Sequence, residues 1–413
     1  MKMKMKRRIN DIKNFFKSIN RSIVAMLVLT LAFTACVQPD YTPYHSKVTL
    51  RTKVLTFRGE TINGNTVGDP AYKWDLQILS GEEFCTAQTI SGNVGSTFTL
   101  RFSENNSGER RSAKIRVRYS EDGYENTFTI LQLPKTSNPD YDHPWAEQPV
   151  HKSLSNVVYK TYYVDDNNAE RIRNYSICYD LNKHVSYWVA YPVHSSYMGG
   201  SGRTNAWSYD DAYYTKSGSD YVRRYVYTNP VIPQSSQWDI SKTFPGYQRG
   251  HVLPSATRLL NYNTNAQTFY APNLVPQHGG LNGGVWATLE GKVRSWSCSD
   301  TLFVVTGALY ESSKTVSRDG NTAAVPSHTY KVLLRTRSGN TNKHLVEIES
   351  ANELKTIGFI FENNDTGSKT SIQSAAVSVA DIERRSGFTF FRNLDPAIAS
   401  SVKSQKNLKD WGL

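Results

Sequence analysis

The chain has 413 residues, which is too long for one ordinary domain and favours two folded units behind a targeting segment. Charged residues make up 20% and hydrophobic residues 38%, as in a soluble globular chain, and 25 Tyr and 8 Trp argue against a helical bundle and for β-rich exported domains. The net charge of +12 falls to +5 without residues 1–36, which carry eight basic residues and one acidic residue. This mild excess is compatible with a polyanionic substrate but does not by itself indicate one.

Residues 1–36 are predicted to be a lipoprotein signal peptide and not part of the fold. A basic stretch, Met1–Arg21, precedes an apolar run, Ile23–Phe33, that is too short to span a bilayer stably. The run ends in Phe33-Thr34-Ala35-Cys36, which resembles a bacterial lipobox and implies that Cys36 carries a lipid. The protein would then be exported and anchored to the outer membrane, on its periplasmic or cell-surface face. An ordinary signal peptide or an uncleaved anchor is the alternative.

Residues 37–133 are predicted to form a small all-β domain after a short tether. An Asp122-Gly123 pair between the last two strands indicates a hairpin, and alternating apolar residues mark the strands: Phe98/Leu100/Phe102, Ile115/Val117/Tyr119 and Phe128/Ile130. These last strands resemble the BACON-type immunoglobulin-like sandwich of bacterial surface proteins. The resemblance implies a glycan contact or a spacer that lifts the next domain off the membrane, and the spacer is favoured. Residues 134–154, which several prolines interrupt, are predicted to be a linker.

Three cysteines remain once Cys36 is set aside, so they cannot all pair within the chain. Cys85 is expected to be a small buried apolar residue. Cys178 and Cys298 are the candidates for one disulfide, which an exported protein tolerates. No cysteine or histidine set has the spacing of a structural zinc site.

Residues 155–413 combine helix and strand signals. Buried strands are predicted at 302–307, 329–334 and 356–361, and a short helix at 378–386. The loop Met198–Gly202 lacks the Lys-Ser/Thr ending of a phosphate loop, so it is interpreted as a flexible surface loop. The stretch Tyr209–Tyr227 could stack on nucleic-acid bases, but an ordinary β-sheet surface is favoured.

The densest group of reactive residue types lies between Gly246 and Arg294. Three segments carry it: Gly246-Tyr247-Gln248-Arg249-Gly250-His251, then Phe269-Tyr270-Ala271-Pro272-Asn273-Leu274-Val275-Pro276-Gln277, then Leu281-Asn282-Gly283-Gly284-Val285-Trp286-Ala287-Thr288-Leu289-Glu290. A histidine, amides, a carboxylate and two arginines are what a metal-assisted phosphodiesterase needs: a base, a ligand for a hard cation and cations for an oxyanion.

A helix is predicted to begin at Asn282. Its apolar residues form one buried stripe because they recur every three or four positions: Trp286, Leu289, Val293 and Trp296. Glu290 and Arg294 are one turn apart and would lie together at the edge of that stripe. In isolation, Asn282 would be a helix cap, and Glu290 would form an ordinary ion pair with Arg294.

In order and spacing, these segments resemble the DNA/RNA non-specific endonucleases, the ββα-metal nucleases, and the resemblance extends over nearly all of residues 155–413. It implies an α+β domain with a central antiparallel sheet and a Mg²⁺-dependent endonuclease that cuts DNA and RNA with little sequence preference. His251 would be the general base that takes a proton from the attacking water. Asn282 would be the direct protein ligand of one Mg²⁺ ion, with Mn²⁺ as a substitute, and Glu290 would orient metal-bound water.

The resemblance also assigns Arg249 and Arg294 to the scissile phosphate and makes Asn273 a residue that organises the site. The family motif Asp-Arg-Gly-His has Gln248 in its first position here, which removes a negative charge near the cation. Thr257 stands where relatives often have Asp. These two departures motivate an alternative, a catalytically weak or inactive surface lipoprotein of the same fold that binds nucleic acid or glycan. The sequence does not indicate an oligomeric state.

Overall fold

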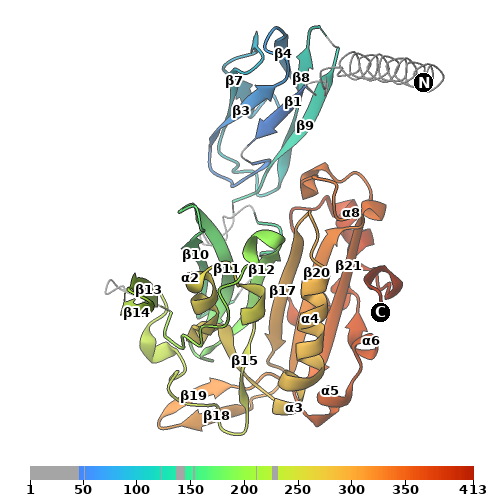
Figure 1. Cartoon of the computed structure of the whole chain (residues 1–413). Coiled ribbons are helices and arrows are strands. Elements are labelled where there is room, and N and C mark those ends of the chain that lie inside the picture. Colours follow the sequence, from blue (N-terminus) through green and yellow to red (C-terminus); the bar gives the residue numbers. More distant parts are fainter. Residues whose placement is uncertain are drawn as a thin grey trace, which may run out of the picture.

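The computed structural model describes residues 46–50, 52–121, 123–135, 145–151, 154–210, 212–225 and 231–413 (Figure 1). The predicted signal peptide, its Cys36 and most of the predicted linker lie outside these ranges, so those assignments stay predictions. Within these ranges the chain builds two units, both made mainly of strands. No helix in the described ranges is long and apolar enough to cross a membrane.

The N-terminal unit is all β, as predicted, and has two sheets around one core. The strand orders are β1-β3-β7-β5 and β2-β9-β8-β4-β6. Phe98 and Ile115, from different sheets, are fully buried in the same cluster, while alternate residues along each strand face outward. The immunoglobulin-like, BACON-type assignment stays a prediction. The strands are β1 (Lys47–Leu50), β2 (Val54–Leu55), β3 (Thr61–Val67), β4 (Lys73–Ser80), β5 (Cys85–Ala87), β6 (Ser91–Asn93), β7 (Thr97–Phe102), β8 (Arg111–Tyr119) and β9 (Glu125–Gln132).

A seven-stranded antiparallel sheet organises the C-terminal unit. Its order is β10-β11-β12-β17-β20-β21-β22, and the three predicted buried strands are its adjacent strands β17, β20 and β21. The bounds are β10 (Val157–Asp165), β11 (Arg171–Asp180), β12 (Val185–Val193), β17 (Leu302–Leu309), β20 (His328–Thr336), β21 (Leu354–Glu362) and β22 (Ala376–Val377). The mixed α+β architecture expected from the sequence is therefore present.

Both faces of this sheet are buried, which explains why its central strands are almost continuously apolar. Val304 and Leu333 lie opposite one another and face the core that includes Leu289 of helix α4 (Ala287–Ser295). Val305 belongs to the second core, on the other face, which Ile382 of helix α7 (Val379–Ser386) helps to cover. Figure 1 shows α4 lying across the central strands. Helix α7 matches the prediction, with Ser378 as its N-cap and Gly387 in the left-handed conformation at its end.

A two-stranded ribbon leads into the helical segment that carries most of the candidate residues. Strand β15 (Gln248–His251) pairs antiparallel with β16 (Leu274–Gln277), and the chain continues through α3 (Gly279–Leu281), a wide turn η7 (Asn282–Trp286) and α4. This strand–strand–helix order is the arrangement implied by the resemblance to ββα-metal nucleases.

The prediction that Asn282 begins or caps this helix is wrong. The helical backbone begins three residues earlier, at Gly279, and Asn282 itself has helical φ and ψ angles of −58° and −49°. The wide π-type turn follows, and Gly284 leaves the helical conformation with φ −105° and ψ −116°. Such single wide turns are frequent at functional sites because they redirect side chains without ending a helix. Of the predicted buried stripe, Trp286, Leu289 and Val293 are buried, and Trp296 is partly buried against the same core.

The predicted Cys178–Cys298 disulfide is also wrong, since Cys85, Cys178 and Cys298 are all free thiols. Cys178 is buried on β11 within an apolar core, whereas the Cys298 thiol, just after α4, donates to the Asp300 carbonyl at 3.0 Å. The two side chains have separate packing environments. Cys85 is 1% exposed in the core of the N-terminal unit, as expected.

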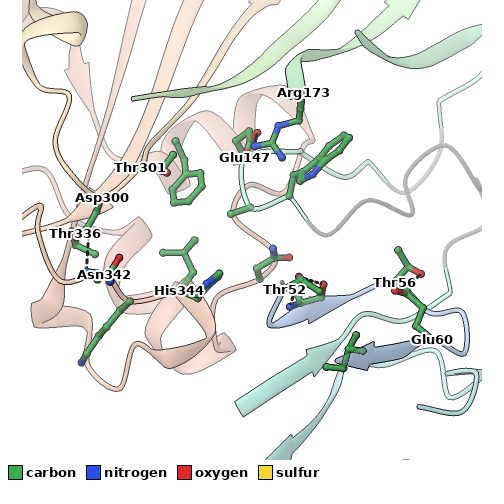
Figure 2. A pocket seen from close by; sticks show the side chains of 18 of the residues that line it. Thr52, Thr56, Glu60, Glu147, Arg173, Asp300, Thr301, Thr336, Asn342 and His344 are labelled. Atoms are coloured by element: carbon green, nitrogen blue, oxygen red, sulfur yellow. Dashed lines mark hydrogen bonds and ion pairs between the residues drawn. The ribbon is translucent and has the colours of Figure 1, made fainter. Parts of the chain in front are cut away.

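The two units meet through polar and apolar contacts and line a cavity of about 870 Å³ (Figure 2). Lys53 pairs with Glu347 at 2.5 Å, and Arg110 donates to the carbonyl of Asn393 at 3.3 Å. In the wall of the cavity Arg173 pairs with the buried Glu147 at 2.6 Å. Apolar side chains also meet here, since Val346 of the C-terminal unit packs against Val54, Leu131 and Leu133. The contact therefore combines a few specific bonds, a small apolar cluster and a cavity.

Smaller elements surround the main sheet. They are η2 (Ser195–Tyr197), β13 (Ala212–Ser217), β14 (Asp220–Tyr225), η3 (Gln234–Ser236), η4 (Ser255–Thr257), α2 (Tyr262–Ala266), η5 (Gln267–Phe269), η6 (Ala271–Asn273), β18 (Thr315–Arg318), β19 (Asn321–Ala324), η8 (Leu345–Glu347), η9 (Ala351–Glu353), α5 (Asp365–Lys369), α6 (Ile372–Ala375), α8 (Pro396–Lys403) and η10 (Lys409–Trp411).

Leu289→Ala should destabilise the C-terminal unit by about 2–5 kcal/mol, because Leu289 is fully buried between α4 and the sheet and its truncation leaves a cavity. Thr288→Ala, on the exposed side of the same helix, should change stability by less than about 0.5 kcal/mol. Urea denaturation followed by tryptophan fluorescence measures both. Equal effects of the two substitutions would contradict the packing described here.

Candidate active site

His251 ends strand β15 in a largely enclosed, aromatic environment. Its ring centroid lies 4.9 Å from that of Phe269 and 5.4 Å from that of Trp207. The Nε2 atom is buried and has no hydrogen-bond partner in the part of the chain that the structure describes. Burial, reinforced by the nearby guanidinium groups of Arg203 and Arg249, lowers the pKa of His251 to about 3. The imidazole is therefore neutral at ordinary pH, with a nitrogen that can accept a proton.

Asn273 fixes the chain immediately after His251. Its Oδ1 accepts from the backbone N–H of Leu253 at 2.8 Å, and its Nδ2 donates to the carbonyls of Leu253 and Thr268 at 3.0 and 2.6 Å. The side chain is fully buried and uses both ends of its amide in these bonds. Asn273 therefore acts as a positioning residue that joins the β15 and β16 ends, and it is not placed to touch a substrate.

Arg249, two residues before His251, lies flat on an aromatic ring. Its guanidinium carbon is 3.6 Å from the Trp207 ring centroid, and its Nη1 donates to the Ile240 carbonyl at 3.0 Å. Burial and the neighbouring Arg203 lower the pKa of Arg249, although it stays a cation. The guanidinium is held in place by the ring and keeps further N–H donors, so it is suited to bind the oxygens of a phosphate.

Arg203 is a member of the site that the sequence did not reveal. Its Nη1 donates to Ser255 Oγ at 3.0 Å, its Nε donates to Asn205 Oδ1 at 2.9 Å, and its guanidinium lies over the Phe269 ring at 4.7 Å. It is close enough to act electrostatically on both His251 and Glu290. Arg203 directly follows the Gly/Ser-rich segment Met198–Gly202, which is interpreted as a surface loop. No sequence motif includes Arg203.

Asn282 contacts Gln248, the residue that stands where the family motif has Asp. Asn282 Nδ2 donates to Gln248 Oε1 at 2.7 Å, across the junction between β15 and the wide turn. Because this bond uses the amide nitrogen of Asn282, it leaves the amide oxygen as the atom that can bind a hard cation. The Gln248 side chain also passes over Gly279, where an added Cβ would lie 3.2 Å from Gln248 Nε2. Gln248 thus fixes the orientation of the expected metal ligand.

Glu290 lies one turn into α4 and is partly buried. Burial raises the pKa of its carboxyl group, while Lys331 and Arg294 act in the opposite direction. The expected close Glu290–Arg294 ion pair is absent: Arg294 acts on Glu290 through space and not within the 4.0 Å of an ion pair. Glu290 and Arg294 lie one turn apart on the helix, as predicted. Because they do not form a close ion pair, both side chains can bind a ligand.

Lys331 is the second residue that sequence reasoning did not single out. It is fully buried on β20, its Nζ donates to Thr306 Oγ1 at 2.9 Å, and it lies 4.3 Å from the Trp286 ring centroid. Burial lowers the pKa of Lys331 to about 8, and the Glu290 carboxylate opposes that shift. A buried ammonium beneath Glu290 favours the ionised carboxylate, which would otherwise be costly at this depth.

The amide oxygen of Asn282 is a donor that suits a hydrated hard cation, since its amide nitrogen is used by Gln248. Mg²⁺ keeps most of its waters and needs few protein ligands. Within the described residues no group of three or more His, Cys, Asp or Glu side chains could hold a metal. The expected single-Asn site does not require one. Thr257, which stands where relatives often have Asp, is buried in η4. It belongs to the turn whose Ser255 accepts a hydrogen bond from Arg203.

The cavity between the two units is separate from this site. None of His251, Asn282, Glu290 or Arg203 lines it (Figure 2). Its size therefore gives no information about where catalysis occurs.

Comparison with known proteins identifies the family. Residues 154–397 match the family model described as DNA/RNA non-specific endonuclease. The chain belongs to this family. Relatives include the mitochondrial nuclease EXOG of Mus musculus, 28% identical over 281 residues that cover 65% of this chain and 69% of the relative. Nuclease C1 of Cunninghamella echinulata is 32% identical over 199 residues, which cover 45% of this chain and 73% of the relative.

A solved structure described as an EndoG/EndoGI complex also aligns with the chain. It is 24% identical, has a TM-score of 0.38 and covers 57% of this chain and 86% of its own. The family match itself extends over nearly all of the predicted endonuclease domain, residues 155–413.

Arg203→Gln is expected to raise the pKa of His251 from about 3 toward its ordinary value, because one of two repelling guanidinium groups is removed while burial persists. NMR titration of ¹³C-labelled histidines measures the shift, with His251→Gln assigning the signal. Arg318→Gln, on the exposed hairpin β18–β19, serves as the control and should leave it unchanged. A His251 that titrates near 6.5 in the unsubstituted protein would contradict the description of this site.

Proposed function

We propose that the protein is a Mg²⁺-dependent endonuclease, with Mn²⁺ able to substitute, that hydrolyses phosphodiester bonds in DNA and RNA with little sequence preference. The observation that carries the proposal is the packing of His251, Arg203 and Arg249 around the rings of Trp207 and Phe269. Arg203 also acts electrostatically on the Glu290 carboxylate. A base, a carboxylate and several guanidinium groups thus share one site, beside an amide whose oxygen suits a hard cation.

The chain's own residues account for most steps of hydrolysis. His251 Nε2 takes a proton from the attacking water, which its neutral state permits. Arg249, Arg203 and Arg294 bind the phosphate oxygens and stabilise the charge that grows there in the transition state.

A phosphate bound between Arg203 and Arg249 also neutralises the charges that depress the pKa of His251. The base consequently becomes stronger when substrate is present. Glu290, whose pKa burial raises, orients water and can pass a proton toward the leaving oxygen. A divalent cation held at Asn282 would polarise the phosphate and offset charge on the leaving group.

Low sequence preference follows from what the site contacts. Guanidinium groups and a cation bind phosphate oxygens, which are the same in every nucleotide and carry no sequence information. The sequence contains no pattern of a recognition helix with base-reading side chains. DNA and RNA are therefore both substrates in this proposal.

The proposal includes a location. The lipobox-like Phe33-Thr34-Ala35-Cys36 supports export and lipid anchoring to the outer membrane through Cys36. In this arrangement the N-terminal β unit acts as a spacer between membrane and enzyme, with a glycan contact as its second possible role. The enzyme would then degrade nucleic acid in the periplasm or outside the cell.

One observation favours a second candidate function. Gln248 replaces the family's Asp and contacts Asn282 directly, so the site lacks a negative charge beside its expected cation ligand. A protein with weak metal affinity could bind nucleic acid at the cell surface without cutting it.

His251→Ala should reduce cleavage of plasmid DNA and RNA by about 10²–10⁴-fold, the usual contribution of a general base. The assay uses residues 37–413 with Mg²⁺, Mn²⁺ or EDTA, and His344→Ala, beside the interunit cavity, is the matched control. Cutting that needs metal and disappears only in His251→Ala supports the enzyme. No cutting by the unsubstituted protein with either metal would favour the binding protein instead.

Gln248→Asp should lower the metal concentration that gives half-maximal cleavage by about tenfold, because it restores a negative charge beside Asn282. Gln248→Asn, which keeps a neutral amide, is the control and should not have this effect. Metal titrations of the initial cleavage rate compare the three proteins. An unchanged or weaker metal requirement in the Asp variant would mean that charge at this position does not limit the site.

A further inference from the structure

The C-terminal unit exposes two large aromatic side chains on one hairpin. Among its described residues, the large hydrophobic side chains with the greatest exposure are Tyr213 at 46%, Tyr221 at 38% and Val231 at 57%. Tyr213 and Tyr221 lie on the hairpin β13–β14, which Figure 1 shows at the margin of the unit beside α2. The antiparallel register places the two rings on opposite faces of the hairpin. Large aromatic side chains that remain exposed are typical of an interaction surface.

Cations accompany the tyrosines across the hairpin. In the antiparallel register Lys216 lies opposite Tyr221, and Arg224 lies opposite Tyr213. Directly opposite residues share a face of a hairpin, so each exposed ring has a basic neighbour at short range. Arg223 adds a third basic side chain. This pairing of rings with cations on both faces suits a polyanion whose backbone carries charge and whose bases carry flat apolar surfaces.

The Tyr221 ring is held in place by a stack of aromatic rings. It stacks on Tyr262 of α2 with a centroid distance of 3.8 Å and an interplanar angle of 5°. Tyr262 in turn contacts Tyr214 at 5.3 Å. One face of Tyr221 is therefore fixed against α2 while the side chain stays 38% exposed. A ring that is already ordered loses little further freedom when another ring stacks on it.

The hairpin is anchored to the segment that builds the active site. Tyr214 Oη donates to the Ala206 carbonyl at 3.0 Å, and Arg223 Nη1 donates to the Trp207 carbonyl at 3.0 Å. Trp207 is the residue whose ring supports Arg249 and packs against His251. The hairpin is therefore tied through Ala206 and Trp207 to the segment that packs against the catalytic histidine.

We propose that the β13–β14 hairpin is a binding surface for single-stranded nucleic acid that guides the strand to His251. A base of the strand can stack on Tyr221 while Lys216 and Arg223, on the same face of the hairpin, bind phosphates. Tyr213 and Arg224, on the opposite face, offer a second contact where the strand passes around the hairpin. A duplex has its base faces covered by neighbouring pairs, so it cannot use the rings in this way. The inference rests on the proposed endonuclease function, because it names the preferred form of that substrate.

The test separates binding from cleavage. Fluorescence anisotropy with labelled oligo(dT), oligo(rU) and a blunt DNA duplex is measured in EDTA, where no cutting occurs. Tyr221→Ala and Tyr213→Ala are each expected to weaken single-strand binding about tenfold and to leave duplex binding within about twofold. Tyr124→Ala, a tyrosine that is 43% exposed in the N-terminal unit, is the matched control and should change nothing.

Three results would overturn the proposal: unchanged single-strand binding in both variants, an equal loss for duplex and single strands, or a similar loss in Tyr124→Ala. If circular dichroism reports that Tyr221→Ala is misfolded, Tyr213→Ala decides, because its exposed ring lies outside the stack on Tyr262. Oligo(dT) and oligo(rU) distinguish a DNA surface from an RNA surface. Single-strand binding that depends on the tyrosines, in a protein that cuts nothing with Mg²⁺, would overturn the endonuclease and keep the binding surface.

Discussion

The electrostatic environment of His251 is the constraint on which the rest of the site depends. A histidine enclosed by Phe269 and Trp207 and repelled by two guanidinium groups cannot easily become charged, so it stays a neutral base. Keeping cations this close to a base is unfavourable unless a ligand later takes up their charge. Arg203 and Arg249 are held there by an aromatic ring each and by hydrogen bonds. The site is therefore preorganised for a phosphate.

The fold supplies rigidity from two directions. On one side Asn273 ties the end of β15 to the end of β16 with bonds that use both ends of its amide. On the other side the sheet supports α4 through Trp286, Leu289 and Val293, and buried Lys331 lies beneath Glu290. The ribbon and the helix meet at a single polar contact, between Gln248 and Asn282. Neither element can move much without breaking buried bonds, which is what a site with a positioned base requires.

The sequence predicts those features that are encoded locally. The apolar spacing of α4 and the continuous apolar strands identify the sheet and the helix, because burial imposes a period on neighbouring residues. The start of the helix is not predictable in this way: Gly283 and Gly284 give no apolar signal, and the wide turn there hides the first helical turn. Arg203 and Lys331 reach the site only through tertiary packing, so their spacing in the sequence does not predict their position there. The predicted Cys178–Cys298 disulfide was wrong because cysteine number alone does not indicate proximity.

The charges of the site also bear on Gln248. Four cations of the site, Arg203, Arg249, Arg294 and Lys331, act on His251 or on the Glu290 carboxylate. This excess of positive charge disfavours a divalent cation in the free protein, and an Asp at position 248 would partly offset it. With Gln248 the compensating negative charge has to come from the substrate phosphate itself. Metal and nucleic acid should therefore bind cooperatively, because each reduces the repulsion that opposes the other. In that view Gln248 ties metal binding to the presence of substrate and leaves the orientation of Asn282 intact.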